Sequence, residues 1–161
     1  MRIYVVADVH GFYSELIKAL KEKGWFEDNG PKLLVVCGDM MDRGREALKM
    51  QAFMTELLEK GQLVFVRGNH EDLMLAMLED ILDDFAPFAD YRSYHIRNGT
   101  LDTAAQLSMF TFPEFIQHHR DFVFKTRQSD FVKKLIPASV NYFETKNYIF
   151  VHGWIPCNRE R

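Results

Sequence analysis

The chain has 161 residues, of which 47% are hydrophobic, 14% aromatic and 27% charged, and its formal net charge is −3. This composition excludes a disordered or fibrous chain and predicts one globular domain, because domains typically contain about 100–200 residues. The weakly acidic charge and the lack of a basic run argue against nucleic acid as a partner.

No apolar run approaches the ~18 residues that a membrane span needs, and the chain starts with a strand-like segment rather than a cleavable signal. We therefore expect a cytoplasmic protein with no membrane partner. The two cysteines, Cys37 in an apolar run and Cys157 near the end, do not indicate a disulfide framework.

The first part of the chain alternates between strand-like and helix-like patterns. Three short apolar runs are expected to form strands, at residues 3–7, 33–37 and 63–66, and the second is typical of a buried strand. A helical pattern follows each of them. Successive strand–helix units of this kind predict a parallel sheet in an α/β fold.

The three helices are expected from their apolar spacing and their end signals. The first has Ser14 as its N-cap and ends at Gly24, and the second covers residues 46–60. The third carries apolar residues at helical spacing from Met74 to Phe85.

The second part of the chain has weaker patterns. It predicts helical pieces at 100–108 and 130–136, with Pro113 and Pro137 as breakers. Two strands are expected around a Thr-Lys-Asn turn, at 141–143 and 148–152.

Polar clusters stand where the apolar runs end. They are Asp8-Val-His10, the Gly-Asp-Met-Met-Asp-Arg-Gly segment 38–44, the Gly-Asn-His-Glu segment 68–71, and His152-Gly153. The first three are each about one βαβ repeat apart, roughly 30 residues. Ligands bind outside the carboxyl ends of strands in open α/β sheets, so these clusters are expected to share one site.

The donor types in these clusters indicate a metal site. Carboxylates, an Asn carbonyl and imidazoles, without a thiolate, suit divalent manganese, iron or zinc rather than a soft metal. Asp39 stands midway through the set and is the candidate for a carboxylate that bridges two ions about 3.5–4 Å apart.

Each cluster alone has a simpler interpretation. An Asp-x-His pair is a weak signal, the 38–44 segment could be a tight turn, and Asn69 could be the N-cap of a helix. The joint occurrence of all four clusters at strand ends, in this order, favours the metal site.

The clusters Asp8-x-His10, 38–44, 68–71 and Val-His152-Gly resemble the signature of the calcineurin-like metallophosphoesterases, specifically the phosphoprotein phosphatase family. The Arg-Asn-Gly-Thr segment 97–100, with Thr103, is similar to a loop of bacterial and phage members and of related dinucleoside tetraphosphatases. The resemblance runs from Arg2 to Gly153, although the family's VHAG motif reads VHGW here.

The resemblance implies two divalent metal ions as cofactors, with manganese favoured and iron or zinc as alternatives. Asp8 and His10 would hold the first ion, Asp39 would bridge, and Asn69 and His152 would hold the second. Water activated by the two ions would then attack the phosphorus without a covalent phosphoenzyme.

The resemblance also implies the catalytic residues. His70 would be the general acid, oriented by Asp42, and Arg43 would clamp the phosphate as a catalytic and substrate-binding residue. Asn69 would contact the substrate as well as the second ion.

The fold implied is the αββα sandwich of the metallophosphoesterases. The family has a further metal-binding His and usually a second phosphate-binding Arg downstream of the position of His152, and the chain ends at Arg161. We therefore expect residues 1–161 to be a single domain that lacks its second half, with weaker binding of the second ion and a tendency to self-associate.

The favoured activity is hydrolysis of phosphomonoesters, with phosphorylated proteins or peptides as the first substrate class. Hydrolysis of a dinucleoside tetraphosphate or a related nucleotide polyphosphate is an alternative that uses the same motifs. A second alternative is an inactive phosphate-binding or regulatory module.

Overall fold

The computed structural model describes residues 1–83, 90–111, 114 and 117–153. Phe85, Pro113 and Cys157, which carry expectations stated above, lie outside the described residues.

The first part of the chain forms three strand–helix units, as the apolar runs predict. The strands β1 (Arg2–Ala7), β2 (Lys32–Cys37) and β3 (Leu63–Val66) make a parallel sheet in the order β1-β2-β3. The helices that follow them are α1 (Tyr13–Glu22), α2 (Ala47–Glu59) and α3 (Asn69–Asp83). The expected α/β fold of the metallophosphoesterase type is confirmed.

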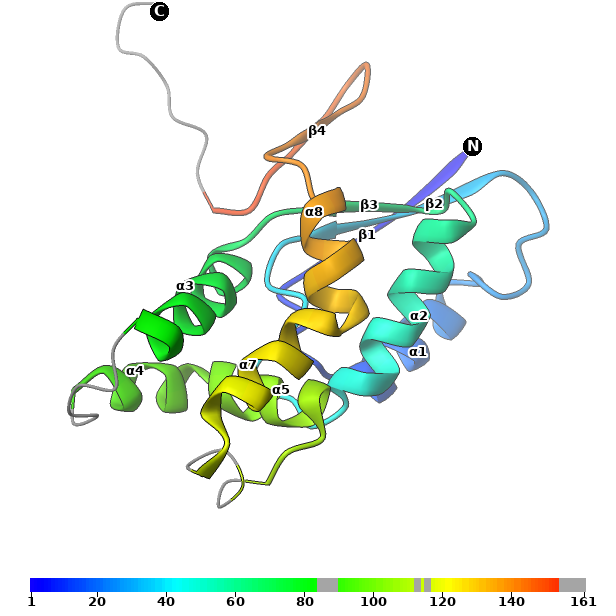
Figure 1. Cartoon of the computed structure of the whole chain (residues 1–161). Helices are drawn as coiled ribbons and strands as arrows, with labels where there is room; N and C mark the ends of the chain where they lie inside the picture. Colours follow the sequence, from blue (N-terminus) through cyan, green and yellow to red (C-terminus); the bar gives the residue numbers. More distant parts are fainter. Residues whose placement is uncertain (84–89, 112–113, 115–116, 154–161) are drawn as a thin grey trace, which may run out of the picture.

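The sheet has an apolar side chain layer on each face. Tyr4, Leu34, Val36 and Phe65 pack in the larger core, on the face that the helices cover (Figure 1). Alternate residues of the same strands, including Val35 and Cys37, pack on the opposite face against the hairpin described below. Because β2 is buried on both faces, its sequence is continuously apolar. Burial also raises the pKa of the Cys37 thiol, which disfavours a reactive thiolate.

The N-cap expected at Ser14 is wrong. Helix α1 begins at Tyr13, with Phe12 at the N-cap and no capping side chain. Ser14 instead donates two hydrogen bonds to the Glu46 carboxylate, from its backbone N–H at 2.9 Å and from its hydroxyl at 2.8 Å. The side chain of Glu46, just before α2, thus satisfies a free N–H at the start of α1.

The second part of the chain is mainly helical. Its elements are α4 (Asp90–Asn98), α5 (Thr100–Ser108), α7 (His119–Gln128), the π-helical turn η1 (Phe131–Leu135) and α8 (Ile136–Ala138). Helix α5 confirms the 100–108 expectation, whereas α4 and α7 were not predicted. Pro137 lies within the three-residue helix α8, and the helical stretch ends one residue later, at Ala138.

The two expected strands are shorter than predicted. They are β4 (Phe143–Glu144) and β5 (Ile149–Phe150), paired antiparallel with Phe143 opposite Phe150. Both phenylalanines pack against the sheet face that carries Val35. The hairpin therefore lies on the side of the sheet opposite the helices, and it leads the chain to His152 (Figure 1).

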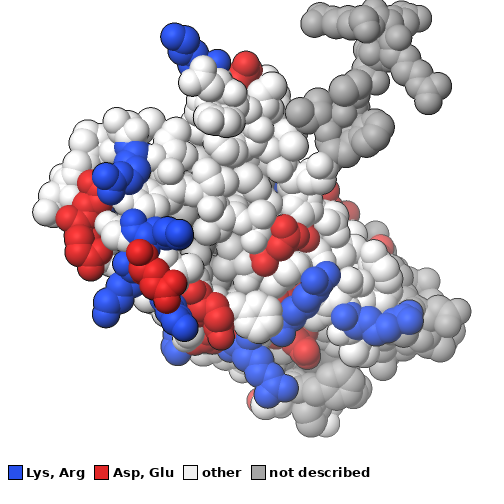
Figure 2. Space-filling model, turned by 180° about the vertical axis from the view of Figure 1, so that it is seen from behind, with Lys and Arg blue, Asp and Glu red and all other residues white. Residues whose placement is uncertain are grey.

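Charges of both signs are mixed on the molecular surface. Lys and Arg side chains are interspersed with Asp and Glu side chains on the face shown in Figure 2. Among the described residues, no helix is long and apolar enough to cross a membrane.

Candidate metal centre and active site

Four segments bring their polar residues to one edge of the sheet. Asp8 and His10 follow β1, Asp39 follows β2, and Asn69 begins α3 just after β3. His152 arrives from β5, and the distance of 3.0 Å between its Nδ1 and the carbonyl oxygen of Cys37 places it at the end of β2. The convergence expected from the strand ends is therefore present.

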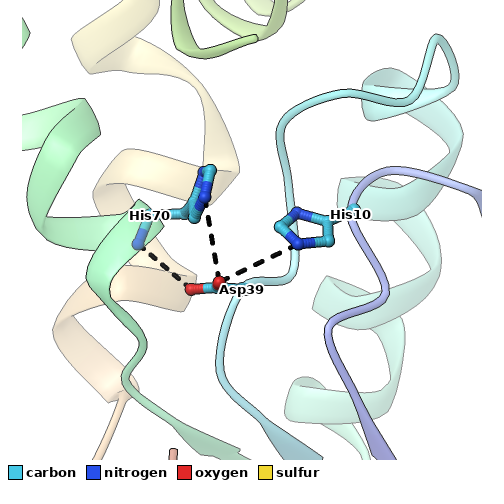
Figure 3. A group of neighbouring side chains, drawn as sticks. All are labelled: His10, Asp39 and His70. Atoms are coloured by element: carbon cyan, nitrogen blue, oxygen red, sulfur yellow. Dashed lines mark hydrogen bonds and ion pairs between the residues drawn. The ribbon is translucent and has the colours of Figure 1, made fainter. Parts of the chain in front are cut away.

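Asp39 lies at the centre of these side chains. Its Oδ2 is 3.9 Å from His10 Nε2 and 3.8 Å from His70 Nε2. Figure 3 shows the carboxylate between the two imidazoles. Its Oδ1 is 3.3 Å from His152 Nε2 and accepts a hydrogen bond of 3.1 Å from the backbone N–H of His70. The two carboxylate oxygens thus face two different sets of donors.

These sets fit two metal ions. The ligand atoms of His10, Asp39 and His70 lie within 4.8 Å of one another, and so do those of Asp8, Asp39 and His152. Asn69 adds a carbonyl oxygen, 3.0 Å from His152 Nε2. Oxygen and imidazole donors around a shared carboxylate match the preferences of manganese, iron or zinc. Asp8 groups with His152 rather than with His10, and His70, the expected general acid, groups with His10, so the division of ligands and the role of His70 stay predictions.

A buried carboxylate–imidazole pair stands beside Asp39. His70 Nδ1 is 2.7 Å from Asp42 Oδ2, and both side chains are almost fully buried. The hydrogen bond to Asp42 raises the pKa of the imidazole, although burial and the charge of Arg43 act in the opposite direction. The pair has the geometry of an oriented general acid.

Arg43 reaches the other nitrogen of the same imidazole. Its Nη2 is 3.3 Å from His70 Nε2. A guanidinium can only donate, so Nε2 accepts and the proton of neutral His70 lies on Nδ1, toward Asp42. Protonation of Nε2 would break this contact, because Nε2 would then have no lone pair to accept from Arg43.

The comparison with known families agrees with this geometry. The sequence profile of the calcineurin-like phosphoesterases matches residues 1–161. The chain belongs to the calcineurin-like phosphoesterase family. This family uses divalent metal ions, and the grouped side chains described above are candidate ligands for them.

Curated relatives of this phosphoesterase have two kinds of names. Serine/threonine-protein phosphatase 1 of Salmonella typhimurium is 41% identical over 73 residues, which are 45% of this chain and 31% of the relative. The asymmetrical bis(5'-nucleosyl)-tetraphosphatase PrpE of Geobacillus sp. is 36% identical over 76 residues, which are 44% of this chain and 31% of the relative. The matched segments therefore span about a third of the length of these two relatives.

A second PrpE aligns over a longer stretch. The asymmetrical bis(5'-nucleosyl)-tetraphosphatase of Halalkalibacterium halodurans is 24% identical over 123 residues, which are 73% of this chain and 46% of the relative. The relatives thus agree with the phosphoesterase family, and their names include both a protein phosphatase and dinucleoside tetraphosphatases.

Two supporting interactions of this phosphoesterase were not predicted. The buried Glu71 carboxylate accepts backbone N–H groups from Gly68 at 2.8 Å, Asp39 at 3.1 Å and Met40 at 3.0 Å. It therefore ties the loop after β3 to the loop after β2. Desolvation raises the pKa of Glu71 to about 6, while the three N–H donors act in the opposite direction. The sequence signal was its place at the end of the 68–71 motif.

The second unpredicted interaction involves Asp42. The Thr100 hydroxyl donates to Asp42 Oδ2 at 2.7 Å, and the Asp42 backbone N–H donates to Thr103 Oγ1 at 3.0 Å. Both threonines are fully buried. Their signal was the Asn-Gly-Thr segment, which carried a resemblance but no assigned role.

Backbone strain is concentrated at the site. Among the described residues, six non-glycine residues have positive φ, and five of them belong to the motifs: Asp8 at 51°, His10 at 50°, Asp39 at 51°, Asp42 at 72° and Arg43 at 64°. Such conformations cost about 1–3 kcal/mol each and persist where the surroundings hold them. Gly68 shows the crowding, since a Cβ there would lie 2.3 Å from Asp39 Oδ1.

Proposed function

We propose that this chain carries the phosphate-hydrolysing centre of a two-metal phosphoesterase, with phosphoserine or phosphothreonine proteins as the preferred substrate class. The observation that carries the proposal is the placement of Asp39, whose Oδ2 faces His10 and His70 while its Oδ1 faces His152. A carboxylate shared in this way is what two adjacent ions need.

The residues would hold the ions as the motifs suggest. Asp8, His10 and Asp39 would supply ligands to one ion, and Asp39, Asn69 and His152 to the other, although Asp8 groups with Asp39 and His152 in the structure. When bound, two divalent ions supply Lewis-acid polarisation of the phosphoryl oxygens and an activated water.

The chain's own residues would perform the remaining steps. Arg43 presents a planar fork of donors that matches two phosphate oxygens. His70 donates its Nε2 proton to the leaving oxygen, and Asp42 keeps the imidazole oriented and favours its charged form. No covalent intermediate is needed, because two divalent ions would activate a water for direct attack at phosphorus.

The nucleotide alternative has its own support. Several curated relatives are named bis(5'-nucleosyl)-tetraphosphatases, of which the Geobacillus protein is 36% identical over 76 residues. Hydrolysis of a dinucleotide would use the same metal centre and the same general acid, with a phosphate as the leaving group.

One assay separates the candidate functions. The chain is treated with a chelator, supplied with Mn²⁺, and offered a phosphoserine peptide and diadenosine tetraphosphate at equal concentrations. Faster turnover of the peptide supports the phosphatase, and faster turnover of the dinucleotide favours the alternative. Saturable Mn²⁺ binding without turnover of either would contradict both and favour a phosphate-binding module.

A further inference from the structure

The orientation of the Asp42 carboxylate depends on hydrogen bonds to one of its two oxygens. Its Oδ2 is in contact with both His70 Nδ1 and the Thr100 hydroxyl, each at 2.7 Å. Its Oδ1 is buried and has no hydrogen-bond partner among the described residues. A carboxylate has a broad torsional preference, so one hydrogen bond alone would let it rotate. The second donor, from Thr100, restricts that rotation.

The direction of the Thr100 hydrogen bond follows from its partners. An ionised carboxylate can only accept, so the threonine hydroxyl donates. Thr100 is the first residue of α5 and is fully buried, so the surrounding atoms restrict the position of its side chain.

The segment before α5 is packed against the same loop. Gly99 has a φ of 81°, and a Cβ at this residue would lie 2.4 Å from the backbone nitrogen of Arg43. Thr103, one turn into α5, accepts the backbone N–H of Asp42 at 3.0 Å. Gly99, Thr100 and Thr103 thus all pack against the loop that carries Asp42 and Arg43. This packing fixes the position of the Thr100 hydroxyl relative to the carboxylate.

We propose that Thr100 is a positioning residue for leaving-group protonation: its hydroxyl holds the Asp42 carboxylate so that His70 presents Nε2 to the leaving oxygen. The inference rests on the proposed function of the site. Thr100 keeps its own proton, the Nδ1 proton of His70 stays on the Asp42 side, and the Nε2 proton moves to the leaving oxygen. Small misplacements of a reacting group can cost about 100-fold in rate, so a rotated Asp42 would slow this transfer.

Two substitutions distinguish the contribution of the Thr100 hydroxyl from that of its methyl group. Thr100→Val keeps the shape and loses the donor, whereas Thr100→Ser keeps the donor and loses a buried methyl. A matched control is Thr126→Val, because Thr126 is also fully buried and its hydroxyl donates to the Phe122 carbonyl oxygen at 2.8 Å.

The first measurement does not depend on activity. In the chelated chain, proton NMR follows the Nδ1 proton of His70, assigned by its loss in His70→Asn. We expect the downfield signal in the wild type, Thr100→Ser and Thr126→Val, and its broadening or loss in Thr100→Val. An unchanged signal in Thr100→Val would overturn the positioning role.

The second measurement uses leaving groups of different basicity in the presence of Mn²⁺. Thr100→Val should lower kcat for phenyl phosphate about 10-fold or more and change that for p-nitrophenyl phosphate by less than about 3-fold, because a good leaving group needs less protonation. Mn²⁺ affinity should be unchanged, and Thr100→Ser should restore most of the rate.

The outcomes distinguish the two proposals. Equal losses in Thr100→Val and Thr100→Ser, on both substrates, would make Thr100 a packing residue and refute its positioning role. A wild-type chain without turnover would refute the proposed function, and the His70 proton signal would still decide whether Thr100 positions Asp42.

Discussion

Substitution of Glu71 tests how the loops after β2 and β3 are held together. Its fully buried carboxylate accepts three backbone N–H groups, from Gly68, Asp39 and Met40. Oε2 accepts the first two, and Oε1 accepts the third. Replacement by Leu removes all three acceptors, whereas replacement by Gln places one amide oxygen at the Oε2 position and one NH₂ group opposite Met40.

The magnitudes separate the two variants. An orphaned buried N–H costs about 1–3 kcal/mol, so with about 2 kcal/mol per donor Glu71→Leu loses about 6 kcal/mol. Both variants also remove the cost of ionising the buried Glu71 carboxyl. Its pKa of about 6, against 4.5 for an ordinary Glu, makes that cost about 2 kcal/mol at neutral pH. The net loss is therefore about 4 kcal/mol for Glu71→Leu and close to zero for Glu71→Gln. The free energy of unfolding of a domain is typically about 5–15 kcal/mol, so Glu71→Leu is expected to be severely destabilised.

Urea unfolding of the chelated chain at neutral pH measures both free energies. The control is Glu56→Gln on the exposed face of α2, where the Glu56 side chain is 59% exposed and pairs with Lys60. It should change stability by less than about 0.5 kcal/mol. Equal destabilisation by Glu71→Leu and Glu71→Gln would show that the three N–H contacts do not explain the contribution of Glu71.

Three further predictions concern the acid, the metals and the pH. His70→Asn should lower kcat about 10²–10⁴-fold while Mn²⁺ affinity stays near the wild-type value, and a parallel loss of bound metal would instead make His70 a ligand. Asp39→Asn should weaken binding of both ions in calorimetric Mn²⁺ titrations, whereas loss of one ion alone would contradict a bridging role. The Ser14 backbone N–H and hydroxyl lower the pKa of Glu46 to about 2. The stabilisation by Glu46 should therefore be complete above about pH 4.5 and disappear as the pH falls through about 2, so thermal unfolding of wild type and Glu46→Gln should converge in acid.

Local sequence patterns determined the sheet and the place of the site. Short apolar runs gave β1, β2 and β3, and the run of β2 is continuous because a strand buried on both faces must be apolar at successive positions. The carboxyl ends of parallel strands share one edge, so Asp8, Asp39 and Asn69 could be placed together before any contact was known. The motif order then indicated a metal-dependent phosphoesterase, and the family match supports it.

The helices of the second part show where sequence patterns were insufficient. Helix α7 (His119–Gln128) buries Phe122, Val123 and Thr126, and its remaining residues are largely polar. A weak apolar stripe of this kind does not predict a helix by itself, since most helical stability comes from packing against the rest of the protein.

Contacts between distant segments of the chain were decided by the tertiary structure. Ser14 meets Glu46 across 32 residues of sequence, and Thr100 meets Asp42 across 58. No local propensity encodes such pairs, because they depend on how α1, α5 and the strand-end loops pack together. The sequence thus determines which residues lie at the sheet edge. Their orientation arises only when distant segments pack around them. An example is the Asp39 carboxylate, whose two oxygens face side chains from different segments.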